Sequence, residues 1–187
     1  MKTARKQSKG FTLVELLVVI AIVAILAAVV VLIINPLELT RRGRDAARLS
    51  DLSNLQNAIN VAVQEATDSG AAILCNGGTY PCRGDSYPLA ASDRLSDGTG
   101  WVLVNLGGQQ SVSVPTLPVD PTNNATYYYT YCADNDAWEI DTVLESEQQK
   151  PKMASDGGDQ NATDTTGRFE VGSNLTLINA SGTPCAF

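Results

Sequence analysis

Residues 9–34 read KGFTLVELLVVIAIVAILAAVVVLII, and this stretch decides the architecture of the N-terminal part of the chain. From Phe11 to Ile34, 24 consecutive positions hold only two polar residues, Thr12 and Glu15. As an α-helix that rises about 1.5 Å per residue, the run is about 36 Å long, which is enough to cross the hydrocarbon core of a bilayer. We therefore expect residues 11–34 to form a membrane helix at some stage of the life of the protein.

Charged residues are distributed unevenly around this run. The 187-residue chain has a formal net charge of −7, but residues 1–10 carry four basic side chains and no acid. Residues 49–187 carry 5 basic and 17 acidic side chains. Because basic flanks stay in the cytoplasm, we expect a short cytoplasmic N-terminus and an exported acidic domain. Such a domain repels phosphate groups, so no specific binding of nucleic acid by the monomer is expected.

The chain contains no histidine. This excludes Ser-His and Cys-His catalysis and removes the commonest zinc ligand. The sequence also has no nucleophile motif, no glycine-rich phosphate-binding loop and no convincing pair of catalytic carboxylates. We therefore expect that the protein is not an enzyme, and a membrane-anchored enzyme is the least favoured class of function.

Two ordinary alternatives for the apolar run are a cleaved secretory signal and an uncleaved signal anchor. The run exceeds the usual apolar core of a secretory signal, which has about 7–15 residues, and no small-x-small cleavage site follows it. Glu15 argues against a plain anchor, because a carboxylate near one end of a membrane helix costs on the order of 1–3 kcal/mol and usually has a partner. A snorkelling carboxylate without a partner is the alternative for Glu15.

Residues 9–16, KGFTLVEL, resemble the class III signal of type IV pilins and type II secretion pseudopilins. In that family a prepilin peptidase cuts after the glycine and methylates the new N-terminal phenylalanine. The resemblance implies that residues 1–10 are a leader peptide, that cleavage falls between Gly10 and Phe11, and that Phe11 is N-methylated. It also implies that Glu15 acts in assembly, where its carboxylate neutralises the Phe11 ammonium of a neighbouring subunit and sets the axial register.

Residues 35–67 continue the helix in amphipathic form. Apolar side chains recur every three or four positions and form one stripe: Leu49, Leu52, Leu55, Ile59, Ala62, Val63 and Ala66. Pro36 has no N–H for the Leu32 carbonyl, so we expect a kink or local melting near residues 32–36. The arginines at positions 41, 42, 44 and 48 leave three interpretations open: a solvated face, an anchor at lipid headgroups, or contacts with the acidic domains of neighbouring subunits.

Residues 68–187 are predicted to form a disulfide-stapled, β-rich head. Short β-like runs occupy residues 101–106, 127–133, 138–144 and 175–178. The clearest hairpin turns at residues 134–136, Asp-Asn-Asp. In its second arm apolar residues alternate with acids, and we expect Glu139, Asp141 and Glu145 to face water.

A second, weaker resemblance lies in residues 117–121, LPVDP, which precede a Tyr-rich strand and are similar to a segment of major pseudopilins and related pilins. The resemblance supports an α+β fold in which a long N-terminal helix packs on a small antiparallel β-sheet, the pilin roll. Residues 68–100 would then cover the region between the helix and the sheet.

All four cysteines, Cys75, Cys82, Cys132 and Cys185, lie in the exported part of the chain, and none forms a C-x-x-C pair. An even number of cysteines beyond a membrane segment suggests two disulfides formed in an oxidising compartment. Three pairings are possible. We expect Cys75 to pair with Cys82 in a short loop, and Cys132 with Cys185 in a link that resembles the C-terminal disulfide loop of many pilins; free thiols are the alternative.

Residues 155–164, SDGGDQNATD, are the only candidate for a metal, and no other cofactor is expected. Asp156, Asp159 and Asp164 offer the hard oxygen ligands that suit Ca²⁺, and two glycines let the backbone fold inward. The spacing does not match an EF-hand. Major pseudopilins bind calcium in a C-terminal loop, but no residue-level motif of theirs carries over, and a solvated acidic loop is the alternative.

The resemblance implies a structural subunit that polymerises through its N-terminal helix into a type IV pilus-like filament, which would serve adhesion, motility or DNA uptake. The alternative is a major pseudopilin of a type II secretion system. The implied partners are further copies of the chain, the prepilin peptidase, and an inner-membrane assembly platform with its ATPase. The subunit would span the inner membrane once before assembly and lie in a cell-surface pilus afterwards.

Overall fold

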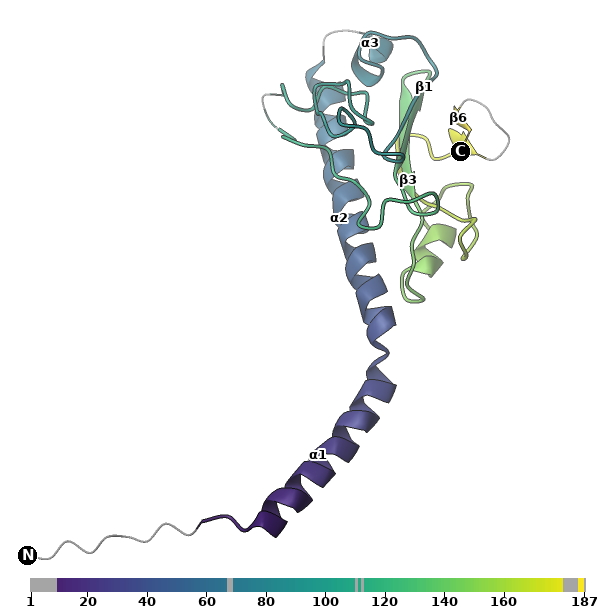
Figure 1. Ribbon diagram of the computed structural model, residues 1–187. Helices are drawn as coiled ribbons and strands as arrows, with labels where there is room; N and C mark the ends of the chain where they lie inside the picture. Colours follow the sequence, from purple (N-terminus) through teal and green to yellow (C-terminus); the bar gives the residue numbers. More distant parts are fainter. Residues whose placement is uncertain (1–9, 67–68, 110, 112, 180–184, 187) are drawn as a thin grey trace, which may run out of the picture. The chain divides into compact units, whose positions relative to one another are not determined.

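The computed structural model describes residues 10–66, 69–109, 111, 113–179 and 185–186 (Figure 1). The chain divides between Leu39 and Thr40 into two compact units. Most of the leader, residues 1–9, and the expected boundary at residues 67–68 lie outside the described residues.

The first unit contains the long apolar helix α1, Leu13–Ile34, and the first residues of helix α2, Pro36–Glu65. α1 and α2 are separated by the single residue Asn35, whose φ of 45° lies in the left-handed region. Pro36 occupies the first position of α2, where a missing N–H leaves no hydrogen bond unmade. The amide of Glu38 donates to the Asn35 carbonyl at 3.1 Å, so Asn35 also begins the new helix. The interruption expected from Pro36 is confirmed at this point.

The second unit contains α2 from Thr40 onward and a four-stranded antiparallel sheet in the order β1-β2-β3-β4. The strands are β1 (Cys82–Asp85), β2 (Thr130–Asp134), β3 (Ala137–Thr142) and β4 (Phe169–Gly172). The remaining elements are α3 (Gly70–Leu74), the 3₁₀ helix η1 (Lys150–Ala154), and a parallel pair formed by β5 (Ile178–Asn179) and β6 (Cys185–Ala186). The predicted α+β class, a long N-terminal helix with a small antiparallel sheet, is confirmed.

The main hydrophobic core joins the apolar stripe of α2 to one face of the sheet (Figure 1). Leu52, Leu55 and Ile59 from α2 are buried together with Tyr131 of β2 and Ile140 of β3. Burying a large apolar side chain stabilises a fold by about 1.5–3 kcal/mol, so this contact holds α2 to the sheet. Val63, which the sequence also assigns to the stripe, is exposed in the last turn of α2.

The β2–β3 hairpin turns through Asn135 and Asp136, whose φ values are 48° and 63°. Asp134 pairs with Ala137, so the turn has two residues, and two positive φ values are typical of a type I′ hairpin. Asn and Asp tolerate this region because their short polar side chains bond locally. The turn predicted at residues 134–136 is therefore confirmed.

The prediction of a strand at residues 101–106 is wrong. This segment is made of bends and one isolated bridge, although four of its apolar side chains are buried: Trp101, Val102, Val104 and Leu106. The amide of Trp101 donates to the Asp93 carbonyl, and its indole N–H donates to the Pro118 carbonyl. The backbone thus bonds to neighbouring loops instead of to a strand. The strand expected at 175–178 is shorter than predicted and begins only at Ile178.

The acids of the second hairpin arm do not face water, as the alternation suggested. Glu139 and Asp141 are fully buried and Glu145 is 6% exposed. The face of the sheet that carries Glu139 and Asp141 points away from the main core, but the chain after β3 returns and covers it. Glu139 Oε2 accepts hydrogen bonds from the amides of Leu177 and Ile178 at 2.8 and 3.0 Å, which shows the cover directly.

Candidate functional site

The first turn of α1 carries the residues of the predicted processing site. Thr12 is the N-cap, and the Glu15 amide donates to its hydroxyl oxygen at 3.2 Å. The Glu15 carboxylate accepts in return from the Thr12 amide at 2.8 Å, which completes a capping box. The bond between Gly10 and Phe11 lies just outside the helix, and a Cβ built on Gly10 meets no atom within 4 Å. The fold of the chain therefore places no steric demand for glycine at this position.

Beyond Glu15 in its first turn, the surface of α1 is apolar on every side. Residues 13–31 have a mean hydropathy of 3.2 and none of them is buried within the chain. The exposed large side chains are Phe11, Leu13, Val14, Leu16, Leu17, Val18, Val19, Ile20, Ile22, Val23, Ile25, Leu26, Val29, Val30 and Val31. A helix that is apolar all round is stable in a membrane or in the core of an assembly, because exposing apolar side chains to water on every face is unfavourable in free energy. By length and composition it can span a membrane.

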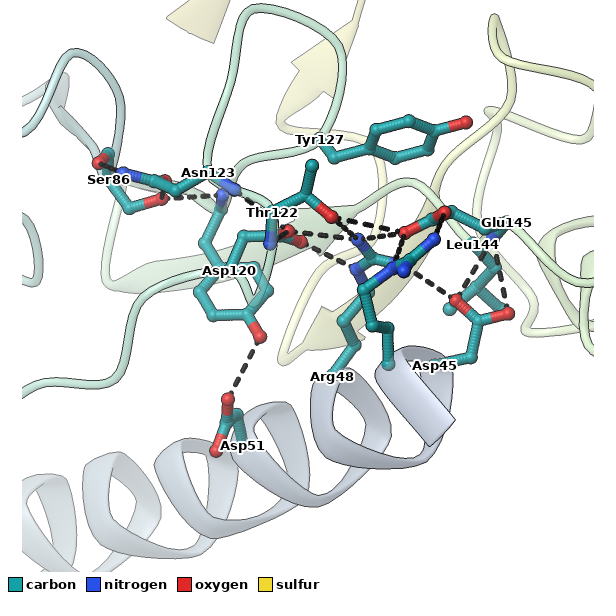
Figure 2. Close-up of polar contacts among 12 residues, drawn as sticks. Asp45, Arg48, Asp51, Ser86, Asp120, Thr122, Asn123, Tyr127, Leu144 and Glu145 are labelled. Atoms are coloured by element: carbon teal, nitrogen blue, oxygen red, sulfur yellow. Dashed lines mark hydrogen bonds and ion pairs between the residues drawn. The ribbon is translucent and has the colours of Figure 1, made fainter. Parts of the chain in front are cut away.

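A second notable site is a buried ion cluster, which we name the α2 anchor: Arg44, Asp45, Arg48, Asp120 and Glu145. Figure 2 labels four of its members, Asp45, Arg48, Asp120 and Glu145. The Arg48 side chain has no exposed surface, and its Nε and Nη2 donate to the two carboxylate oxygens of Asp120 at 2.6 and 2.9 Å. Its Nη1 donates to Asp45 at 2.8 Å, and its Nη2 lies 2.6 Å from Glu145. One guanidinium thus joins α2 to two separate loops of the head.

The other members complete the hydrogen bonding of the α2 anchor. The Asp45 carboxylate accepts from the amides of Glu145 and Ser146 at 2.9 and 2.7 Å. Arg44 makes a second, bidentate contact with Glu145. Figure 2 shows the Tyr127 ring beside the Arg48 guanidinium, with 5.0 Å between the ring centroid and the guanidinium carbon, a cation–π distance.

Charge pairing governs the protonation of the α2 anchor. Burial alone would raise the pKa of Glu145, but hydrogen bonds from Arg44 and Arg48, together with their charges, lower it to about 2. Burial alone would lower the pKa of Arg48, but its hydrogen bonds to Asp120, Glu145 and Asp45 raise it above its ordinary value. Glu145 and the two arginines of the cluster therefore remain ionised at neutral pH.

Two of the four arginines do not fit any of the three interpretations drawn from the sequence. Arg48 is buried and Arg44 is half-buried, and both pair with acids of their own chain, whereas Arg42 is exposed. One local signal pointed to this arrangement: Asp45 and Arg48 stand three residues apart on one helix face.

The structure contains both disulfides in the expected pairing. Cys75 is bonded to Cys82 and Cys132 to Cys185, each with a Cα–Cα distance of 5.9 Å. Cys82 packs against the main core, whereas Cys132 and Cys185 pack with Leu177 and Ile178 on the other face of the sheet.

The three acids of the calcium candidate do not converge. Asp156 accepts from the amides of Gly158 and Glu170, Asp159 accepts from Gln160, and Asp164 accepts from the amide and hydroxyl of Thr166. Within the described part of the chain, no group of three or more Asp, Glu, Cys or His side chains is arranged to hold a metal ion.

Comparison with known proteins identifies the N-terminal segment. Residues 5–31 match the family model described as the prokaryotic N-terminal methylation motif. Searches of curated proteins and of solved structures found no significant match. The matched motif points to a structural subunit, and it implies processing by prepilin peptidase and assembly into a filament. The chain carries the class III signal and the apolar N-terminal helix of the type IV pilins and type II secretion pseudopilins.

Proposed function

We propose that the protein is a structural subunit that polymerises through α1 into a type IV pilus-like filament, with the acidic, disulfide-stapled head outside. The observation that supports this most is the apolar surface of α1, which is exposed on all sides from Phe11 to Val31. In a membrane that surface contacts lipid before assembly, and in a filament it contacts the helices of other subunits. The subunit would act by assembly and not by catalysis.

The proposal assigns paired roles to Phe11 and Glu15. Removal of residues 1–10 leaves an ammonium on Phe11, which an apolar helix bundle would bury. A carboxylate from Glu15 of a neighbouring subunit neutralises that charge, because an unpaired buried charge costs several kcal/mol. A shift of one helical turn would separate the two charges, so the pair selects one axial register.

Mass spectrometry of filament protein tests the processing step. We expect a mature chain that begins with N-methylated Phe11. A chain that retains Met1, or one cut after Ile34, would contradict the proposal. Because the fold leaves room at Gly10, a Gly10→Val chain that stays unprocessed would show that the peptidase, and not folding, requires the glycine.

Substitutions of Glu15 test the assembly step. Glu15→Val should be processed and inserted into the membrane, since it makes α1 more apolar, but it should give few filaments. Glu15→Gln is the matched control, because an amide oxygen can still cap Thr12 without carrying charge. If the charge pair sets the register, both variants fail to assemble, whereas normal assembly of Glu15→Gln would leave only a capping role.

The second candidate is a major pseudopilin, which the LPVDP segment at residues 117–121 favours by resemblance. A secretion filament and a surface pilus share the same N-terminal chemistry, so the phenotype of a deletion strain separates them. Loss of surface filaments with normal protein export supports the pilin. Retention of secreted hydrolases in the periplasm supports the pseudopilin.

A further inference from the structure

We propose that the loop 155–168, between η1 and β4, is a latch that closes on the sheet without calcium. The resemblance to pseudopilins raises the possibility of a cation in this region. The carboxylates of the loop and of the adjoining strands instead accept hydrogen bonds from N–H groups of the chain. Hydrogen bonds within the chain, and not a bound cation, therefore hold the loop on the sheet.

Asp156 anchors the start of the loop. Its Oδ1 accepts from the Gly158 amide at 3.1 Å, and its Oδ2 accepts from the Glu170 amide at 3.0 Å. Both oxygens are therefore directed at the backbone, one within the loop and one in β4. A cation site of 6–8 oxygens would need such carboxylates to point at a common centre.

Glu170 holds the middle of the loop from the sheet side. The Glu170 side chain is 2% exposed, and its Oε2 accepts from the Gln160 amide at 3.1 Å. A Cβ built on Gly158 would lie 1.9 Å from that same oxygen, so a glycine is needed for the loop to approach so closely. The amide of Arg168 then donates to the Gln160 carbonyl at 3.1 Å and closes the loop on itself.

Behind Glu170 lies a second buried acid, Glu139 of β3. The Oε1 atoms of Glu139 and Glu170 are both buried and accept no hydrogen bond from the described residues. Burial raises the pKa of both carboxyl groups, which favours their neutral form and reduces the charge that a cation would otherwise balance. Glu139 Oε2 accepts from the amides of Leu177 and Ile178, so this acid, like Glu170, is directed at the backbone of a covering segment.

Thermal melting of the full-length chain in detergent micelles, with millimolar CaCl₂ or with EGTA, tests the proposal. We expect the same melting temperature in both for the unaltered chain. Asp156→Ala should lower it by about 4–8 °C, because the two bonds to a charged acceptor are lost, and by the same amount in CaCl₂ and in EGTA. Asp164→Ala is the matched control: its carboxylate bonds only to Thr166 and is exposed, so its shift should be clearly smaller.

Two results would overturn the latch. The first is a rise of the melting temperature with CaCl₂ that Asp156→Ala abolishes. The second is a shift for Asp156→Ala no larger than that for Asp164→Ala. Calorimetric titration of the unaltered chain with CaCl₂ gives an answer even if Asp156→Ala fails to fold: stoichiometric binding heat contradicts the proposal, and the absence of heat supports it.

Discussion

Arg48 is the residue on which the α2 anchor depends, because three carboxylates share its guanidinium in a site without solvent. Arg48→Met should lower the free energy of unfolding by about 3–5 kcal/mol, since the buried acids lose their principal counter-charge. Chemical denaturation of the full-length chain in detergent, followed by tryptophan fluorescence, measures this loss. Lys152→Met removes the same charge from an exposed position and should change the free energy by less than about 0.5 kcal/mol. Equal effects of the two substitutions would show that the α2 anchor contributes nothing beyond net charge.

On the covered face of the sheet, the Asp141 side chain of β3 is fully buried. Burial raises the pKa of Asp141 from 3.8 to about 6, although the charge of Arg168 and its hydrogen bond to Asp141 act in the opposite direction. A raised pKa means that folding favours the neutral acid. This contribution is complete below pH 3.8, decreases as the pH rises, and is lost above pH 6.

Asp141→Asn tests this pH dependence, because asparagine keeps an oxygen for Arg168 and cannot ionise. Between pH 4 and pH 7 the unaltered chain should lose about 2 kcal/mol of stability relative to the variant, since part of the change already occurs below pH 4. Denaturation curves for both chains at several pH values give the difference, in which the titration of all other groups cancels. A difference that does not change with pH would contradict the raised pKa.

Several elements could be predicted from the sequence because their signals are local. The length and composition of residues 11–34 were sufficient for α1, and Pro36 was sufficient for the interruption at Asn35. The β2–β3 hairpin followed from Asn135 and Asp136, two residues that tolerate positive φ. In each case the physical cause lies within a few residues of the structure that it produces.

Features that depend on distant segments could not be predicted in this way. Alternation along β3 separated the two faces of the strand correctly, but it carried no information that Leu177 and Ile178 would return to cover Glu139. The apolar composition of residues 101–106 predicted that the segment is buried, but not its backbone conformation, since a buried loop and a buried strand can have the same composition. The bond of Arg48 to Asp120 spans 72 residues, so only the shorter link to Asp45 left a local signal.

The two disulfides should stabilise the head unequally. The Cys132–Cys185 bond spans 53 residues and the Cys75–Cys82 bond spans 7. On chain entropy the longer loop contributes about 4 kcal/mol and the shorter about 2.5 kcal/mol. Denaturation of the two double serine variants measures both values, each variant serving as the control for the other. A larger loss for the short loop would show that local packing around Cys75, and not chain entropy, dominates.

The placement of these cysteines on opposite faces of the sheet also determines which pairs of sulfurs can form a disulfide. Cys82 and Cys132 lie on neighbouring strands, but Cys82 pairs across with Ala133, and Cys132 pairs with Arg83. Their side chains therefore point in opposite directions, so these two sulfurs cannot bond in the observed register. A slip of β1 by one residue would place Cys82 directly opposite Cys132 and on the same face. A subunit isolated with these two sulfurs joined would therefore carry a covalent record of that misaligned strand.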